Sequence, residues 1–133
     1  MRKLFVALAL TLLVACSGDG PTGAGGDISG TYNLSTVNGI ALPYLLQESG
    51  PRVEVFSDSY ILGTAGKFIQ STSFRVTSGD TVTFEIFPDS GSYTVQGTAV
   101  LFNFADNSTL SATLGTGALS FSSGGLATVY LKQ

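Results

Sequence analysis

The side chains that most often carry catalysis are scarce in this chain. The sequence contains no histidine, so it lacks the usual general base near neutral pH, the commonest zinc and copper ligand, and the usual partner of a serine or cysteine nucleophile. Its single cysteine is Cys16. The groups that remain for chemistry are carboxylates, hydroxyls and a few lysine and arginine side chains.

The densest group of carboxylates comprises Asp80, Glu85 and Asp89. Glycoside hydrolysis needs two carboxylates facing each other across roughly 5–10 Å. Here Asp80 falls in an expected turn, Glu85 on the polar face of an expected strand, and Asp89 beside Pro88. Because nothing in this pattern brings the three together, we expect a protein that is not an enzyme.

Two shorter patterns have plain structural explanations. Residues 64–67 place a threonine three positions before a lysine, but in a glycine-rich turn rather than on one face of a helix. Residues 106–108 (Asp-Asn-Ser) offer turn oxygens that suit calcium, yet they lack the alternating acidic ladder of a dedicated calcium loop. An Asx turn is the expectation there. We therefore expect no metal and no cofactor.

Aromatic rings form the remaining candidate site. They are either the core of a filled domain or the lining of an apolar cavity, and a barrel of about eight strands permits both, since its interior either just fills or holds one small ligand. The candidate ligand-lining residues are Tyr32, Phe74, Phe84, Tyr93, Phe102, Phe104, Phe121 and Tyr130.

The elements that must position these rings are β-strands. From residue 28 onward apolar residues alternate with polar ones, as in Val82, Phe84 and Ile86, which is the period of a strand with one buried face. Turn signals separate the runs, the strongest being Asn38-Gly39, a type I′ candidate. Short strands joined by tight turns predict an antiparallel meander of about eight strands. Closure into a barrel would remove its bare edges; a two-sheet sandwich is the alternative.

Two places break the alternation. Val53 and Val55 are at odd positions whereas Tyr60 and Leu62 are at even ones, so we expect one inserted residue, a bulge, near residues 57–59. Pro88 cannot donate a hydrogen bond to a neighbouring strand, so we expect it to mark a corner or a strand switch.

The first fifteen residues predict export. Arg2 and Lys3 precede an apolar run that ends at Ala15, which is the arrangement of a secretory signal peptide. The run is shorter than the roughly 20 residues of a membrane-spanning helix. Cys16 directly after it resembles the lipobox of bacterial lipoproteins, in which that cysteine becomes the acylated (palmitate-bearing) N-terminus. A chance cysteine beside an ordinary signal-peptidase site is the alternative.

Residues 16–27 are the expected lipidated cysteine and a flexible, glycine-rich tether, and residues 28–133 the folded domain. The resemblance to lipoproteins implies anchorage in the bacterial cell envelope, and Ser17 favours the outer membrane, facing the periplasm. Without Arg2 and Lys3, nine acidic side chains outnumber the four remaining basic ones. This balance argues against a nucleic-acid partner.

Several short motifs resemble those of bacterial lipocalin-like lipoproteins, lipid-anchored proteins with a small antiparallel barrel. They lie in residues 30–32, 37–43, 91–97 and 100–102. True lipocalins open their first strand with Gly-x-Trp, where this chain has Tyr32 and contains no tryptophan. The resemblance implies a non-catalytic module that binds a small apolar ligand or an envelope component. The alternative is a structural or protein-interaction domain with a solid core.

Overall fold

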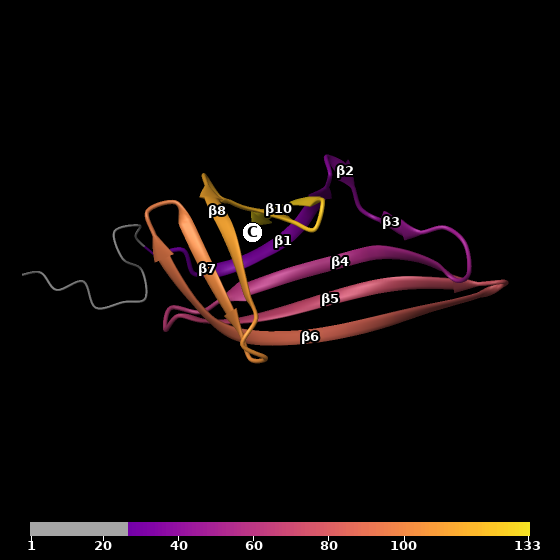
Figure 1. Ribbon diagram of the computed structural model, residues 1–133, viewed down its shortest axis with the longest axis horizontal. Coiled ribbons are helices and arrows are strands. Elements are labelled where there is room, and N and C mark those ends of the chain that lie inside the picture. The colour runs from indigo at the N-terminus through magenta and orange to yellow at the C-terminus, as the bar shows by residue number, and fades with distance from the viewer. Residues whose placement is uncertain (1–26) are drawn as a thin grey trace, which may run out of the picture.

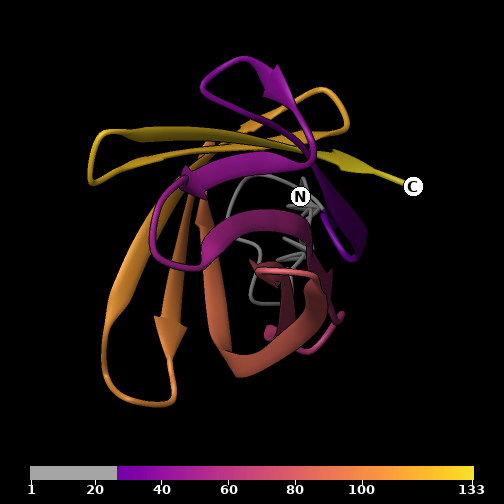
Figure 2. The same cartoon turned by 90° about the vertical axis from the view of Figure 1, so that its right-hand side faces the viewer.

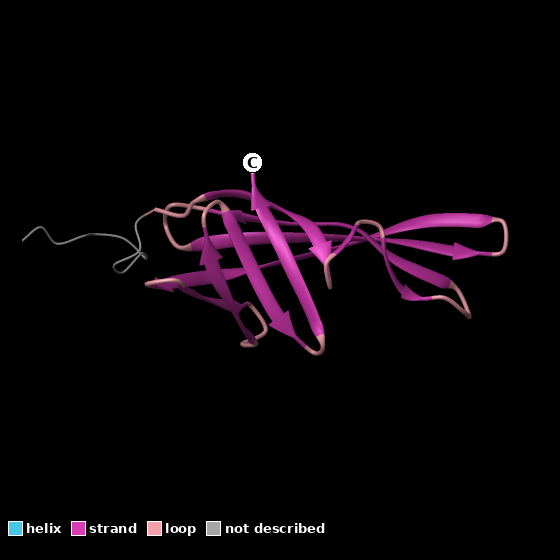
Figure 3. Ribbon diagram, turned by 90° about the horizontal axis from the view of Figure 1, so that it is seen from above, coloured by secondary structure: helices cyan, strands magenta, loops and turns pink. Residues whose placement is uncertain are grey.

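The computed structural model describes residues 27–133. The expected signal peptide, Cys16 and all of the tether except Asp27 lie outside the described residues. The described part of the chain consists of strands and loops (Figure 3). No helix within it is long and apolar enough to cross a membrane.

Ten strands follow one another along the chain (Figure 1). They are β1 (Gly30–Val37), β2 (Ile40–Ala41), β3 (Tyr44–Gln47), β4 (Arg52–Leu62), β5 (Lys67–Ser78), β6 (Thr81–Gln96), β7 (Ala99–Phe104), β8 (Thr109–Gly115), β9 (Ala118–Ser123) and β10 (Leu126–Lys132).

The sheet is an antiparallel meander that closes on itself. From β4 to β10 each strand pairs with the next, and β1 pairs with β10 on one side and with β4 on the other. The result is a closed barrel of eight strands, with β2 and β3 attached outside it (Figure 2). The expected all-β barrel is confirmed, and the sandwich alternative is not what forms.

The tight turn at Asn38-Gly39 is also confirmed. Both residues have positive φ, 50° and 77°, as a type I′ turn requires, and Val37 pairs with Ile40 directly across it. This hairpin places the short strand β2 beside the last residues of β1, on the edge whose first residues pair with β4.

Alternation along the strands places one side chain in two inside the barrel. The fully buried side chains include the rings of Tyr32, Tyr60, Phe68, Tyr93 and Phe102. These rings belong to five different strands, so the core is shared by the whole barrel rather than built from one hairpin.

Three strands extend well beyond the barrel. β6 has 16 residues, but β7 pairs only with its last part, Gly91–Gln96. The first half of β6 pairs with the second half of β5, which in turn pairs with the first half of β4. We call this extension, with β3 along its other side, the arm; it comprises residues 44–47, 52–57, 73–78 and 81–88 and projects to the right in Figure 1.

The expected bulge lies close to its predicted place, one residue before the range 57–59. The register between β4 and β5 shifts between Val55 and Ser57, leaving Phe56 as the inserted residue. Because of this insertion, Val55 and Asp58 lie on the same face of the sheet although their numbers differ in parity.

The prediction that Pro88 marks a corner or a strand switch is wrong. β6 continues through it without a register shift. The Ser90 carbonyl accepts a hydrogen bond from the Ala105 amide beyond the end of β7, and residues two apart on a strand direct their backbone groups to the same side. The Pro88 nitrogen therefore faces the side of β6 away from β5, where its missing N–H costs no hydrogen bond.

Candidate functional site

Most of the aromatic residues predicted to line a cavity come together inside the barrel. Tyr32, Tyr93, Phe102, Phe121 and Tyr130 are buried, and Phe104 is partly buried against them. Phe74 and Phe84 do not join this group, because both lie on the arm, where Phe84 is 54% exposed.

The rings fill the barrel interior by packing on one another. Tyr60, which we did not predict as a site residue, lies 5.1 Å from Phe102, 5.3 Å from Phe121 and 5.2 Å from Tyr130, measured between ring centroids. Phe68 lies 5.1 Å from Phe102. These are ordinary distances for aromatic pairs in direct contact, so the rings leave no room between them for a ligand of their own size.

Two hollows of the described part of the chain are bordered by exposed residues. The larger, about 600 Å³, is open to solvent where β5, β6 and β7 meet, beside Lys67, Ser90 and Asn103. A smaller one of about 110 Å³ is bordered by Thr94, Leu101 and Ser111. Neither is the enclosed, apolar cavity in which a small molecule is usually held.

A buried carboxylate lies at the end of the barrel from which the arm projects. Asp58 is 8% exposed and accepts hydrogen bonds from Tyr130 Oη (2.6 Å), Gln70 Nε2 (3.0 Å) and Thr72 Oγ1 (3.1 Å). Burial raises the pKa of Asp58, while these hydrogen bonds act in the opposite direction. Burial of the Tyr60 and Tyr130 hydroxyls, together with the nearby Asp58 charge, raises the pKa of both tyrosines well above the usual value.

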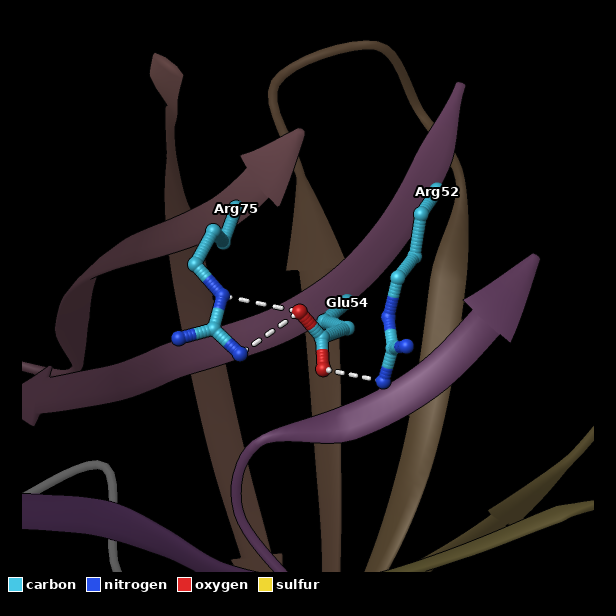
Figure 4. Close-up of polar contacts among 3 residues, drawn as sticks. All are labelled: Arg52, Glu54 and Arg75. Atoms are coloured by element: carbon cyan, nitrogen blue, oxygen red, sulfur yellow. Dashed lines mark hydrogen bonds and ion pairs between the residues drawn. The ribbon is translucent and has the colours of Figure 1, made fainter. Parts of the chain in front are cut away.

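A second buried carboxylate lies on the outer face of the arm (Figure 4). Glu54 is 4% exposed and is held between two arginines. Arg75 approaches it with Nε at 2.8 Å and Nη2 at 2.7 Å from Oε2, and Arg52 Nη2 lies 3.2 Å from Oε1. The Arg75 hydrogen bond is the main reason why the pKa of Glu54 is lowered. All four oxygens of Asp58 and Glu54 thus have fixed partners.

Four apolar side chains are exposed together on that outer face. Phe56, Val82, Phe84 and Ile86 are 44%, 53%, 54% and 66% exposed, and we call them the arm patch. The rings of Phe56 and Phe84 meet at 5.0 Å, and the Arg75 guanidinium lies 6.0 Å from the Phe56 ring. Single exposed apolar residues are common, but a contiguous group of them is a candidate interaction surface.

The carboxylates expected to stay apart do so. Asp80 lies in the turn at the tip of the arm, Glu85 halfway along it opposite Phe74, and Asp89 at its root opposite Gln70. Among residues 27–133 no group of three potential metal ligands comes together. The Asp106 carboxylate accepts hydrogen bonds from the Ser108 amide and hydroxyl, which is the expected Asx turn.

Comparisons with known proteins add no family to these observations. No protein family, curated protein or solved structure matches the chain.

The two buried carboxylates were not predicted as site residues, although the sequence contained a signal for them. Glu54 and Asp58 are acidic residues in a strand that also contains several apolar residues, and Arg75 lies on the neighbouring strand. A buried carboxylate needs hydrogen-bond or ion-pair partners, so these two residues could have indicated two polar clusters. The arm itself had no such signal, because a strand has the same alternation whether or not it extends past a barrel.

Proposed function

We propose that this chain is a lipid-anchored protein of the bacterial cell envelope, in which a filled, lipocalin-like barrel is a scaffold and the arm binds another protein. The supporting observation is the contrast between the two parts: the barrel interior is occupied by its own rings, whereas the arm exposes Phe56, Val82, Phe84 and Ile86 side by side. Exposing such a patch lowers solubility unless a partner covers it.

The position of the anchor agrees with this role. Gly30, near the start of the described chain, pairs with Leu62, the last residue of β4. The arm lies at the other end of β4, which begins at Arg52. A membrane tether attached before residue 27 therefore leaves from the end of the barrel opposite the tip of the arm. The arm patch stays accessible in the anchored protein.

The alternative of a small apolar ligand inside the barrel has less support, because the rings that would line its cavity contact one another instead. Catalysis has less support still. The two buried carboxylates are held by hydrogen bonds and ion pairs from their neighbours, and the exposed ones are spread along β6.

Site-specific photo-crosslinking in the producing bacterium tests the proposal. A photoreactive amino acid in place of Ile86 should yield a crosslinked protein of one defined mass, identified by mass spectrometry. The same residue in place of Ser111, which is exposed on the outside of β8, is the matched control and should yield none. Absence of a product at position 86, or the same product at both positions, would overturn the proposal.

A further inference from the structure

The arm has a strand edge to which nothing is hydrogen-bonded. β6 pairs with β5 from Thr81 to Ser92, but with β7 only from Gly91 onward. As the Ser90 carbonyl is directed towards β7, the backbone groups of even-numbered residues in β6 point away from β5. On the arm, the N–H and C=O of Val82, Phe84 and Ile86 therefore face open solvent.

This edge has few of the features that usually protect a free edge from pairing. Proteins place prolines, charges or bulges in exposed edge strands to prevent it. The one charged side chain between Val82 and Ile86 is that of Glu85, which lies on the opposite face of the sheet from the arm patch. Here the proline, Pro88, lies at the root of the arm, and β6 shows no register shift against β5. The three residues that offer backbone groups are all apolar, and each is more than half exposed.

The edge is complementary to itself in one antiparallel register. With Phe84 opposite Phe84 of a second copy, Val82 comes opposite Ile86, and the backbone groups of these residues form a ladder of about six hydrogen bonds. Glu85 then comes opposite Thr83, so the acidic side chains do not meet. Moving the register by two residues in one direction would place Glu85 opposite Glu85, and like charges directly opposed are destabilising.

The length of the edge limits how far such pairing extends. Beyond Ile86 the next outward-facing residue is Pro88, which has no N–H to donate. In the antiparallel register it would meet Asp80, in the turn at the tip of the other arm. The ladder therefore ends where the arm ends, and each barrel lies beyond the tip of the other arm.

From this geometry we infer that the partner of the arm is a second copy of this chain, joined to the first by antiparallel pairing of β6 with β6 about a two-fold axis at Phe84. This pairing rests on the proposed function of the arm as an interaction surface, and it names the partner. The two arm sheets become one continuous sheet, whose outer face joins the two arm patches.

Disulfide trapping of the full-length chain in the envelope tests the register. Opposed, hydrogen-bonded residues have Cα atoms about 5.5 Å apart, within the range of roughly 4.4–6.8 Å that a disulfide spans. Phe84→Cys should therefore give a covalent dimer on non-reducing gels. Ile86→Cys is the matched control: it is on the same face and more exposed, but its copies are four residues out of register, about 13 Å apart.

A second pair of variants checks the register independently. Chains with Val82→Cys produced together with chains with Ile86→Cys should form a mixed dimer, because these residues face each other. The wild-type chain, whose single cysteine is Cys16, gives the background. Circular dichroism and thermal melting of each variant should match the wild type, since the substituted side chains are exposed.

The outcomes separate this inference from the proposed function. Dimer from Phe84→Cys with only background from Ile86→Cys supports the β6–β6 pairing. Equal yields from the two variants, or background from both, overturn it. If trapping fails while the photoreactive residue at position 86 captures a different protein, the arm remains an interaction surface and the second copy is wrong. If both experiments fail, both proposals fail.

Discussion

At the scale of single residues, Asp58 makes one contribution to how the stability of the barrel depends on pH. Its carboxylate is buried without a cation, and burial raises its pKa above the value of the unfolded chain. Because the folded chain holds the Asp58 proton more tightly than the unfolded chain does, protonation of Asp58 stabilises the fold. This stabilisation is fully present below the usual aspartate pKa, and it is lost as the pH rises through the raised pKa of the folded state. An ionised Asp58 thus destabilises the barrel near neutrality relative to acid.

Asp58→Asn should remove this dependence. The quantity to measure is the free energy of unfolding of the wild type minus that of the variant, from urea titrations at a series of pH values. We expect this difference to fall as the pH rises from below 4 towards neutrality. Asp106→Asn is the control with the opposite sign, because the Ser108 hydrogen bonds lower the pKa of Asp106. A flat difference curve for Asp58→Asn would contradict the assigned cause.

The two arginines around Glu54 differ in what they contribute. Arg75 makes two close contacts with Glu54 Oε2 and is 32% exposed, whereas Arg52 makes one contact of 3.2 Å and is 49% exposed. Exposed single ion pairs contribute little to stability, while removing the partner of a buried carboxylate is costly. Arg75→Gln should therefore lower the urea midpoint more than Arg52→Gln does. Equal shifts of the urea midpoint would mean that the closer contacts of Arg75 with Glu54 do not make it the more stabilising arginine.

At the scale of elements, β6 can enter the barrel only because residue 91 is glycine. A Cβ there would lie 1.9 Å from the Asn103 carbonyl oxygen and 2.9 Å from Phe68 Cε1. The first of these atoms belongs to the backbone of the paired strand β7 and cannot move without breaking the ladder. Gly91→Ala should destabilise the protein by about 1–3 kcal/mol, as overpacked sites do.

Gly115→Ala is the matched control for that experiment. Gly115 is also in a strand, but its added Cβ would meet nothing closer than 3.9 Å, from Ala118 Cβ. The control should stay within about 0.5 kcal/mol of the wild type in urea unfolding. Similar losses for both variants would show that strand glycines are costly to replace for a general reason rather than through the contact at Asn103.

Much of the strand arrangement could be predicted from local sequence, whereas the length of β6 relative to its neighbours could not. Alternation gave the strands and the inward rings, Asn38-Gly39 gave the first turn, and the change of parity after Val55 gave the bulge. Pro88 was misinterpreted because its effect depends on which edge of the strand faces a neighbour. That is a property of the assembled sheet, and the exposed position of Phe84 follows from the same cause.

At the scale of the whole molecule, a filled barrel and a ligand-binding barrel respond differently to the loss of a core ring. Phe102 is fully buried and contacts the rings of Tyr60, Phe68 and Phe121. Phe102→Ala should cost about 3–5 kcal/mol and leave a void. Native mass spectrometry should then show uptake of a benzene-sized probe by the variant and not by the wild type. Uptake by the wild type would favour the small-ligand alternative.

The proposed lipid on Cys16 would hold the arm at a membrane surface instead of leaving it in free solution. If Cys16 carries lipid, two copies confined to one membrane meet at a high effective concentration, and an edge of three residues can pair without a large interface. Cys16→Ser should abolish acyl labelling and move the protein from the membrane to the soluble fraction after cell breakage. The signal peptide is left intact, so export continues if an ordinary signal peptidase accepts the altered site.

The same variant links the anchor to pairing. In a Phe84→Cys background, release from the membrane should reduce the yield of disulfide-linked dimer, because dilution into the periplasm removes the confinement. Quantified non-reducing gels of the two chains, at equal expression, make the comparison. Unchanged membrane partitioning of Cys16→Ser would contradict the lipoprotein assignment, whereas normal release with an undiminished dimer would mean that the two strand edges bind each other strongly enough without a shared surface.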